Sequence, residues 1–251
     1  MSPINQQSLN KTLMNVNGPK QACSNCCQRE RCLPIGLEGP DLDRLDSLVT
    51  RRRHMQRGDH AFRAGAPFQS LFAIRTGFFK TYELQEDGQE HITGFHMAGE
   101  IIGMDAISTV HNACNAVALE YSEICEIPFP QLEILCREIP ALQHQFHKLM
   151  SRVIIHGHGI MMLLGGMSAE ERLAAFFLNL SQLYAIRSYS ATDFHLRMTR
   201  DEIGHYLGMK LETVSRTLAK FQRQRLITVN GRHIELQDLV RLRQVMNREE
   251  M

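Results

Sequence analysis

Apolar residues follow two different spacings along this chain, and the change between them falls near residue 130. Between about residue 58 and that point, short runs rich in aromatic and β-branched residues alternate with glycine-containing turns. Short runs with regular turn signals are typical of antiparallel sheets. The pattern predicts a sandwich, barrel or roll whose strands lie at residues 71–75, 78–84, 91–96, 117–121 and 124–128.

Beyond residue 130 the apolar spacing becomes helical. A short helix is predicted at residues 130–137, and a long helix begins at Pro140 because proline fits the first turn of a helix. Apolar residues along the long helix recur at alternating steps of four and three, as in helices that pair with a second copy. The predicted dimerisation positions are Leu142, Phe146, Leu149, Val153, His156, Gly157, Ile160 and Leu163, and Met150, Ile154 and Met161 widen the apolar face.

A helix packed on its own domain is the alternative to this dimer interpretation. The wide apolar face and the position of the helix between two dissimilar regions favour the dimer. Gly157 and Gly159 lie near its centre, and each glycine costs a helix up to about 1 kcal/mol relative to alanine. A dimer contact weakened at its centre would suit a switch.

Residues 168–236 predict helices followed by a β-hairpin. Ser168 and Thr199 each precede a glutamate by three residues, the capping-box pattern that begins a helix. Gly204 permits a close helix crossing, and Gly208 suits the turn between one helix and a second helix at residues 211–223. An asparagine–glycine turn at residues 230–231 then joins residues 227–229 to residues 233–236. This order is that of a winged helix–turn–helix.

The electric charge of the chain supports a nucleic-acid interface in this region. The whole chain has a net charge of only +1, but residues 197–225 contain seven Lys or Arg against three acids. With the apolar residues of the second helix buried, the exposed Glu212, Ser215 and Arg216 can read base edges. Lys210, Thr213 and Lys220 are suited to phosphates. A solvated charged face is the alternative.

The candidate chemistry of the chain lies in its cysteines. Cys23, Cys26 and Cys32 lie within ten residues, so a looping backbone can turn three thiolates toward one point. Such groups bind a soft metal or an iron–sulfur cluster, or they form disulfides. An iron–sulfur cube normally takes four cysteines, so a fourth must come from elsewhere. We expect Cys27 to be a bystander, and Cys114 and Cys136 to be small apolar fillers.

The remaining composition narrows the class of protein. The N-terminus has no apolar signal-peptide core and no run of apolar residues is long enough to span a membrane, so we expect a cytoplasmic protein with reduced thiols. Seven cysteines, an odd number, then favour metal or redox chemistry over a disulfide scaffold. A Ser/His/Asp set, a carboxylate pair and a phosphate loop are absent from the sequence, which argues against an enzyme.

Several motifs in the chain are specific to one family. The sequence reads ITGFH at residues 92–96, VALE at 117–120, CEIPF at 125–129, EERLAAF at 170–176 and ETVSR at 212–216. Over about residues 23–236 it resembles the FNR family of oxygen-sensing transcription regulators, within the cyclic-AMP-receptor superfamily. The resemblance implies an α+β fold with an N-terminal antiparallel β-roll of the cyclic-nucleotide-binding type, a long dimerisation helix and a C-terminal winged helix–turn–helix.

The resemblance also implies a cofactor and partners. A [4Fe–4S] cluster is expected on Cys23, Cys26, Cys32 and Cys125. The intact cluster would favour a homodimer, and this dimer would bind a TTGAT-N4-ATCAA-like palindrome in DNA and contact RNA polymerase. Oxygen would degrade the cluster and release the DNA. The family's base-reading positions correspond to Glu212, Ser215 and Arg216. A zinc site or a thiol redox sensor in a regulator of the same superfamily is the alternative.

The chain departs from the family pattern at two places. Gly157 lies where close relatives often carry an aspartate that keeps the cluster-free protein monomeric. Residues 112–115 lack the arginine with which cyclic-nucleotide binders hold the phosphate, although Gly99 and Glu100 are present, so no cyclic nucleotide is expected. The expected divisions are a disordered N-terminus (1–22), the cysteine segment with the β-roll (23–139), the dimerisation helix (140–166) and the DNA-binding domain (167–251).

Overall fold

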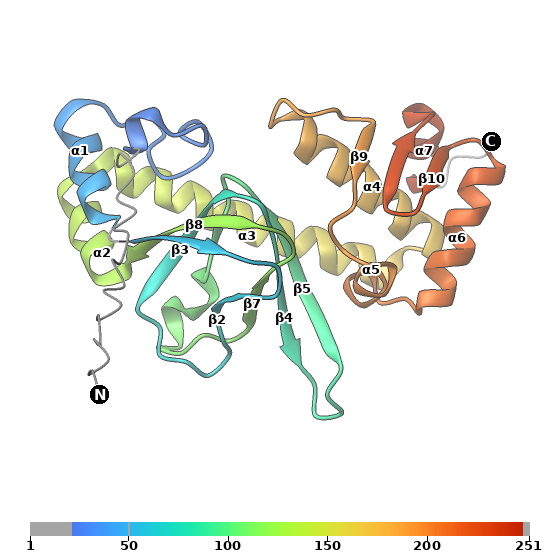
Figure 1. The fold of residues 1–251 in the computed structure, drawn as a ribbon, viewed down its shortest axis with the longest axis horizontal. Helices are drawn as coiled ribbons and strands as arrows, with labels where there is room; N and C mark the ends of the chain where they lie inside the picture. Colours follow the sequence, from blue (N-terminus) through green and yellow to red (C-terminus); the bar gives the residue numbers. More distant parts are fainter. Residues whose placement is uncertain (1–21, 50, 248–251) are drawn as a thin grey trace, which may run out of the picture.

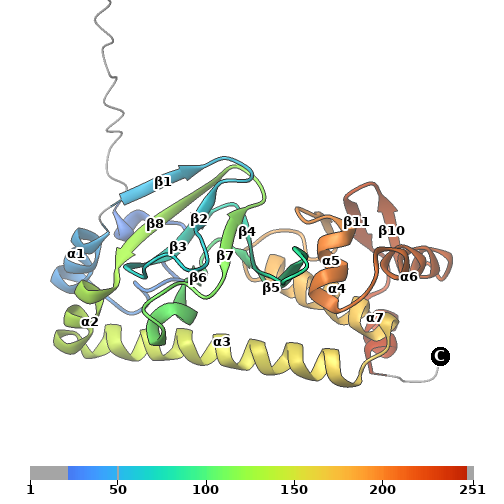
Figure 2. The same ribbon diagram turned by 90° about the horizontal axis from the view of Figure 1, so that it is seen from below.

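The structure is a computed structural model that describes residues 22–49 and 51–247. A β-roll is followed by the long helix α3 (Pro140–Gly166) and by a C-terminal domain of helices with a small sheet (Figure 1). In Figure 2, α3 runs beneath the roll and reaches the C-terminal domain. The α+β fold is therefore confirmed. The predicted disordered N-terminus lies outside the described residues, apart from Ala22.

Two four-stranded antiparallel sheets form the roll. One has the order β1-β8-β3-β6 and the other the order β2-β7-β4-β5. Large apolar side chains, among them Phe72, Phe79 and Ile124, fill the space between them. The strands are β1 (Arg51–Met55), β2 (His60–Phe62), β3 (Ser70–Thr76), β4 (Phe78–Leu84), β5 (Glu90–Met97), β6 (Ile101–Ile102), β7 (Asn115–Ala118) and β8 (Ser122–Pro128).

All five predicted strands exist, with one displaced. The strand predicted at residues 117–121 is β7, which begins at Asn115 and ends at Ala118. Three strands of the roll, β1, β2 and β6, were not predicted, nor was β9 (Asp193–His195) of the C-terminal domain. The β1 sequence begins with three arginines and lacks the alternation of apolar and polar residues, and β6 has two residues, too few to form a pattern.

A second core joins the cysteine segment to the helices beside the roll. Leu33 and Leu37 of this segment are buried with Leu45 of α1, Leu132 of α2 and Leu142 of α3. The elements concerned are the short 3-10 helix η1 (Cys23–Asn25), α1 (Gly39–Leu48) and α2 (Phe129–Glu138); another 3-10 helix, η2 (Met104–Ser108), follows β6. The predicted short helix at residues 130–137 is α2, and Pro140 begins α3 as predicted.

The C-terminal domain has the predicted winged helix–turn–helix. Both capping boxes are formed, at Ser168 before α4 and at Thr199 before α5. The hairpin differs in its turn: Asn230 pairs with His233 as a strand residue, so the two turn residues are Gly231 and Arg232. The elements are α4 (Ala169–Ala185), β9 (Asp193–His195), α5 (Arg200–Leu207), α6 (Leu211–Arg223), β10 (Ile227–Asn230), β11 (His233–Leu236) and α7 (Leu239–Met246).

Two glycines set the angle between α5 and α6. A Cβ atom on Gly204 would lie 2.5 Å from the carbonyl oxygen of Met209, so only glycine permits this close approach. Gly208 ends α5 with φ at 62°, in the left-handed region that glycine adopts without strain. Both predicted roles are confirmed. No helix of the described residues is long and apolar enough to cross a membrane.

Candidate cysteine site and nucleic-acid interface

The four predicted cluster ligands come from three parts of the fold. Cys23 lies in η1, Cys26 and Cys32 lie in the loop that follows, and Cys125 lies in the middle of β8. The backbone N–H of Cys23 donates a 2.8 Å hydrogen bond to Asp46 Oδ1, which ties this segment to α1. The side-chain amide of the buried Gln145 donates to the carbonyl of Cys32 over 3.4 Å, which ties the segment to α3.

The four thiols are close enough to affect one another electrostatically. Burial raises the pKa of Cys23 to about 12, and the charges of Asp46, Cys32 and Cys125 act in the same direction. Burial also raises the pKa of Cys32 to about 12; a backbone hydrogen bond opposes this, while Cys125 and Cys26 add to it. The pKa of Cys125 is raised by burial, and Arg52, which is hydrogen-bonded to the thiol, opposes that increase.

The donor set fits an iron–sulfur cluster in its chemistry. The four thiols lie near enough to affect one another electrostatically, and Arg52 is hydrogen-bonded to Cys125, so a positive charge lies beside this thiol. Arg75 also reaches Cys26, but its guanidinium is paired with Glu123 over 2.6 Å. No group of three or more His, Cys, Asp or Glu side chains in the described residues is arranged to hold a metal ion. Cluster binding would therefore require the thiols to converge and lose their protons.

The other three cysteines lie apart from this set. Cys27 is exposed. Cys114 is buried inside the roll, where its thiol donates to Asp105 Oδ2 over 3.4 Å. Cys136 is buried in the core around α2. Burial agrees with the predicted filler role of Cys114 and Cys136, and the bystander role of Cys27 stays a prediction.

The predicted dimerisation positions on α3 do not share one environment. Leu142, Phe146 and Leu149 are buried against the roll side of their own chain, and Leu163 is buried against the C-terminal domain. Ile160 packs partly on that domain as well, and His156 hydrogen-bonds the hydroxyl of Tyr206 over 3.2 Å. Only Val153 and Gly157 of the predicted set are left clear of these contacts within the chain. The first turns of α3 therefore follow the alternative interpretation, a helix packed on its own domain.

An uncovered apolar surface remains in the second half of α3. Every residue from 151 to 159 is exposed. Ile154, Met161 and Met162 are 59%, 63% and 76% exposed, which is unusual for side chains of this size. Met150, Ile154, Gly157 and Met161 follow one another at steps of four, three and four. Gly157 belongs to the predicted set, and Met150, Ile154 and Met161 are the residues predicted to widen its apolar face; Met150 also packs partly on the core beside the roll.

The predicted base-reading residues lie on the outer side of α6. Val214, Leu218 and Phe221 of α6 are buried, while Glu212 and Arg216 are exposed one turn apart. Ser215 and Thr213 are partly exposed on the same helix, and Thr213 Oγ1 accepts a 3.4 Å hydrogen bond from Arg216. Lys210 is the exposed residue that precedes α6. Lys220 differs, because its Nζ lies 2.6 Å from Glu170 Oε1 of α4.

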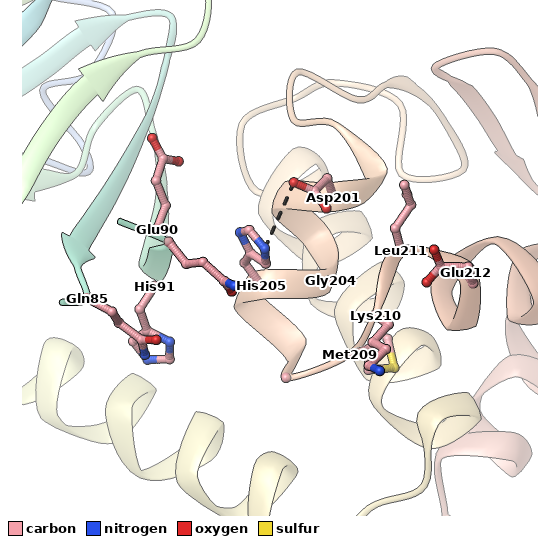
Figure 3. Close-up of a pocket in the computed structure, with 12 residues that line it drawn as sticks. Gln85, Glu90, His91, Asp201, Gly204, His205, Met209, Lys210, Leu211 and Glu212 are labelled. Carbon is pink, nitrogen blue, oxygen red and sulfur yellow. Dashed lines mark ion pairs between the residues drawn. The ribbon is translucent and has the colours of Figure 1, made fainter. Parts of the chain in front are cut away.

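An open cleft separates the β4–β5 hairpin from the helix–turn–helix. Figure 3 shows Gln85, Glu90 and His91 on the hairpin side, facing Asp201 and His205 on α5, with Lys210 and Glu212 at the start of α6. Because the cleft reaches the N-terminus of α6, the hairpin leaves that end of the helix open.

Charged residues that join the roll to the C-terminal domain were missed by sequence reasoning. Lys80 of β4 is buried and forms ion pairs with Glu90 on β5 and, over 2.9 Å, with Glu202 on α5. Arg187 binds Glu100 over 2.6 Å, so this glutamate serves the contact between domains. The available signal was Lys80 itself, a charged residue that follows two phenylalanines in β4, whose first five residues are all buried.

Comparison with known proteins gives matches over most of the chain. The model described as "Cyclic nucleotide-binding domain" matches residues 52–138, and "Crp-like helix-turn-helix domain" matches residues 171–245. The chain is 44% identical over 216 residues to the "Fumarate nitrate reduction regulatory protein" of Klebsiella oxytoca, covering 86% of each protein. It is 43% identical over 220 residues to the "Anaerobic regulatory protein" of Pasteurella multocida, covering 88% of this chain and 81% of that protein. FixK2 from Bradyrhizobium japonicum has a similar structure, with 27% identity and a TM-score of 0.73 over 79% of this chain and 98% of that one.

Proposed function

We propose that this chain, which belongs to the FNR family of the Crp superfamily, senses oxygen through a [4Fe–4S] cluster. Members of this family are DNA-binding transcription regulators and not enzymes, and the relatives support a role in the anaerobic response. Cys23, Cys26, Cys32 and Cys125 would hold the cluster. The observation that supports this most is the approach of four thiols from η1, its following loop and β8. When bound, the cluster supplies an iron–sulfur centre that oxygen degrades.

The chain itself links these cysteines to α3. Gln145, which is buried in α3, holds the carbonyl of Cys32, and Leu33 directly after it is buried in the same core as Leu142. A segment held by four ligands would keep these contacts in place. A freed segment would weaken the packing around the first turns of α3. The cysteines therefore influence the helix through its buried half.

The uncovered half of α3 provides the proposed dimer contact. The face of Met150, Ile154, Gly157 and Met161 keeps the steps of four and three that suit paired helices. Gly157 lies at its centre, and the lack of a side chain there lets two helices approach closely. We assign the homodimer contact to this face, which keeps Gly157 of the predicted set, and not to Leu142, Phe146 and Leu149, which are buried within the chain.

Two paired helices would present two copies of α6 to a palindrome. Half-sites about one turn of duplex apart, roughly 34 Å, suit such a dimer, as in the TTGAT-N4-ATCAA-like sequence. Arg216 would read guanine, Glu212 cytosine, and Ser215 a base edge or phosphate. Lys210 and Thr213 suit phosphates, and Lys220 would first have to leave Glu170.

The remaining proposals concern RNA polymerase and the domain boundaries. The tip of the β4–β5 hairpin, residues 85–88, is exposed and separated from the helix–turn–helix by the cleft, so it is available for a contact with polymerase.

The proposed division keeps residues 23–139 for sensing, 140–166 for dimerisation and 167–251 for DNA binding.

Anaerobic purification with iron and sulfide counts tests the proposed cofactor. We expect a brown protein with broad absorbance near about 400 nm that bleaches in air, and loss of both iron and colour in Cys125→Ser. Cys27→Ser is the matched control, because Cys27 is exposed and outside the set. A colourless protein with one zinc per chain would instead support the structural zinc site, and a metal-free protein whose thiols oxidise reversibly would support the redox sensor.

A further inference from the structure

We propose that Arg31, between Cys26 and Cys32, couples the cysteine segment directly to the DNA-binding domain of the same chain. The coupling would act beside the route through α3. This coupling rests on the proposed function, because that function supplies the signal, namely gain or loss of the cluster. The contact of Arg31 itself is present in the structure independently of that function.

The contact meets the end of α4, the first helix of the C-terminal domain. Arg31 Nε donates a 2.9 Å hydrogen bond to the carbonyl oxygen of Ile186, and its Nη2 donates to the same oxygen. Ile186 is the C-cap residue, directly after the last residue of α4. The last carbonyls of a helix lack partners within the helix and carry partial negative charge, so a guanidinium is a favourable ligand there.

The β5–β6 turn at residues 98–100, here called the junction turn, supports this contact from both sides. On one side the cysteine segment packs on it so closely that a Cβ atom on Gly99 would lie 2.9 Å from Arg31 Cβ and 3.0 Å from Gln28 Oε1. On the other side Arg187, one residue after Ile186, donates from Nε to the carbonyl of Ala98 over 2.8 Å. The same guanidinium pairs with Glu100.

The junction turn is itself fixed to the roll. The N–H of Gly99 donates to the carbonyl of Ile74 over 2.8 Å, and the N–H of Ile74 donates to the carbonyl of Glu100 over 2.9 Å. The φ of Gly99 is 92°, a conformation that favours glycine. A rigid turn thus holds both the cysteine segment and the end of α4. Movement of the segment would therefore reach the DNA-binding domain without passing through α3.

The coupling predicts that DNA affinity can fall while cluster content and dimerisation are kept, which a route through α3 alone does not predict. Removing the Arg31 guanidinium leaves the cysteines, Gln145 and the exposed face of α3 unchanged, so cluster content and dimerisation should be kept. DNA affinity should fall about fivefold, because a less restrained domain has more freedom to lose when it binds the operator.

The test compares Arg31→Ala with Glu30→Ala, a neighbouring exposed residue for which the described residues provide no hydrogen bond or ion pair. Under anaerobic conditions, iron and sulfide content, sedimentation and anisotropy with a fluorescent palindromic duplex measure cluster, dimer and DNA affinity separately. Hydrogen exchange of the metal-free proteins then follows the amides of residues 186–189, which are hydrogen-bonded to the last turn of α4. We expect exchange there to be several-fold faster in Arg31→Ala only.

The outcomes distinguish this proposal from the proposed function. Equal DNA affinity and equal exchange in the two variants would overturn the coupling, as would a loss of DNA affinity in Arg31→Ala that tracks a loss of cluster or dimer. If the unmodified chain holds no cluster or ignores the palindrome, the proposed function fails, and the exchange rates of the metal-free variants still decide whether Arg31 restrains the end of α4.

Discussion

The two halves of α3 have similar apolar spacing but different surroundings. In the first half, Leu142, Phe146 and Leu149 are covered by the cysteine segment, α2 and the roll. In the second half, residues 151–159 are exposed, and Ile154 and Met161 remain 59% and 63% exposed, although Leu163 nearer the end is buried. Periodicity thus shows that a helix face is to be buried, but it does not say which partner buries it.

The largest effect is expected from a charge in the uncovered half. Ile154→Glu would place two carboxylates in the proposed dimer contact, where burial of unpaired charge is costly, and should weaken dimerisation about 1000-fold. Sedimentation equilibrium of the anaerobic protein measures it. Val153→Glu is the control, because Val153 is similarly exposed, at 52% against 59%, but lies about a quarter turn away. Equal loss in the two variants would return the contact to the originally predicted face.

Truncation of a side chain in the covered half should instead lower the stability of the single chain. Leu142 is fully buried, so Leu142→Ala should lower the free energy of unfolding by about 3 kcal/mol through lost apolar contact and a cavity. Ile154→Ala should change it by less than about 0.5 kcal/mol in the metal-free protein at low concentration. Urea unfolding measures both. Similar values would mean that the two halves are equally covered in solution.

These differences show where sequence reasoning succeeds. The capping box of Thr199 and the turn at Gly208 depend on residues a few positions apart, and both were predicted correctly. On α3, apolar side chains surround much of the helix and the four–three spacing fits two neighbouring registers, so the spacing alone does not separate the Val153 register from the Ile154 register. Cys125 was chosen through family resemblance, since nothing local to β8 identifies a ligand.

The contacts between domains could not be predicted in the same way. Arg31 lies 155 positions from Ile186 in the sequence, and its partner is a backbone carbonyl, which any residue could supply. Arg187 is likewise directed at a turn 87 to 89 positions away. Only the folded chain brings these groups together, so no spacing in the sequence reveals them.

A smaller effect is expected at the glycine in the centre of the uncovered half. In a two-fold dimer Gly157 would meet its own copy, so Gly157→Asp would set two like charges close together and weaken dimerisation about tenfold at low salt. Gly159→Asp is the control on the other side of the helix, and a Cβ atom at either position meets nothing within 4 Å. Sedimentation at two salt concentrations should show the difference shrinking as salt rises. Identical behaviour of the two variants would exclude Gly157 from the contact.

The smallest effect is expected at the ion pair between Lys80 of the roll and Glu202 of the C-terminal domain. Burial acts to raise the pKa of Glu202, but the N–H of Thr199 and the charge of Lys80 outweigh it, so the pKa is lowered. Burial likewise acts to lower the pKa of Lys80, and Glu90 and Glu202 outweigh it. Both groups are therefore charged at neutral pH. A lowered carboxyl pKa contributes stability that is complete above its ordinary range and is lost as pH falls through the lowered value.

The prediction is tested by urea unfolding of the metal-free protein between pH 7 and pH 3. At neutral pH the unmodified chain should be about 1 kcal/mol more stable than Glu202→Gln, and this difference should disappear as the pH falls. Asp201→Asn is the control, because Asp201 is exposed and its ion-pair partner is His205 of the same helix, at 3.9 Å. If Glu202→Gln and Asp201→Asn had the same pH dependence, the Lys80 ion pair would not restrain the domain.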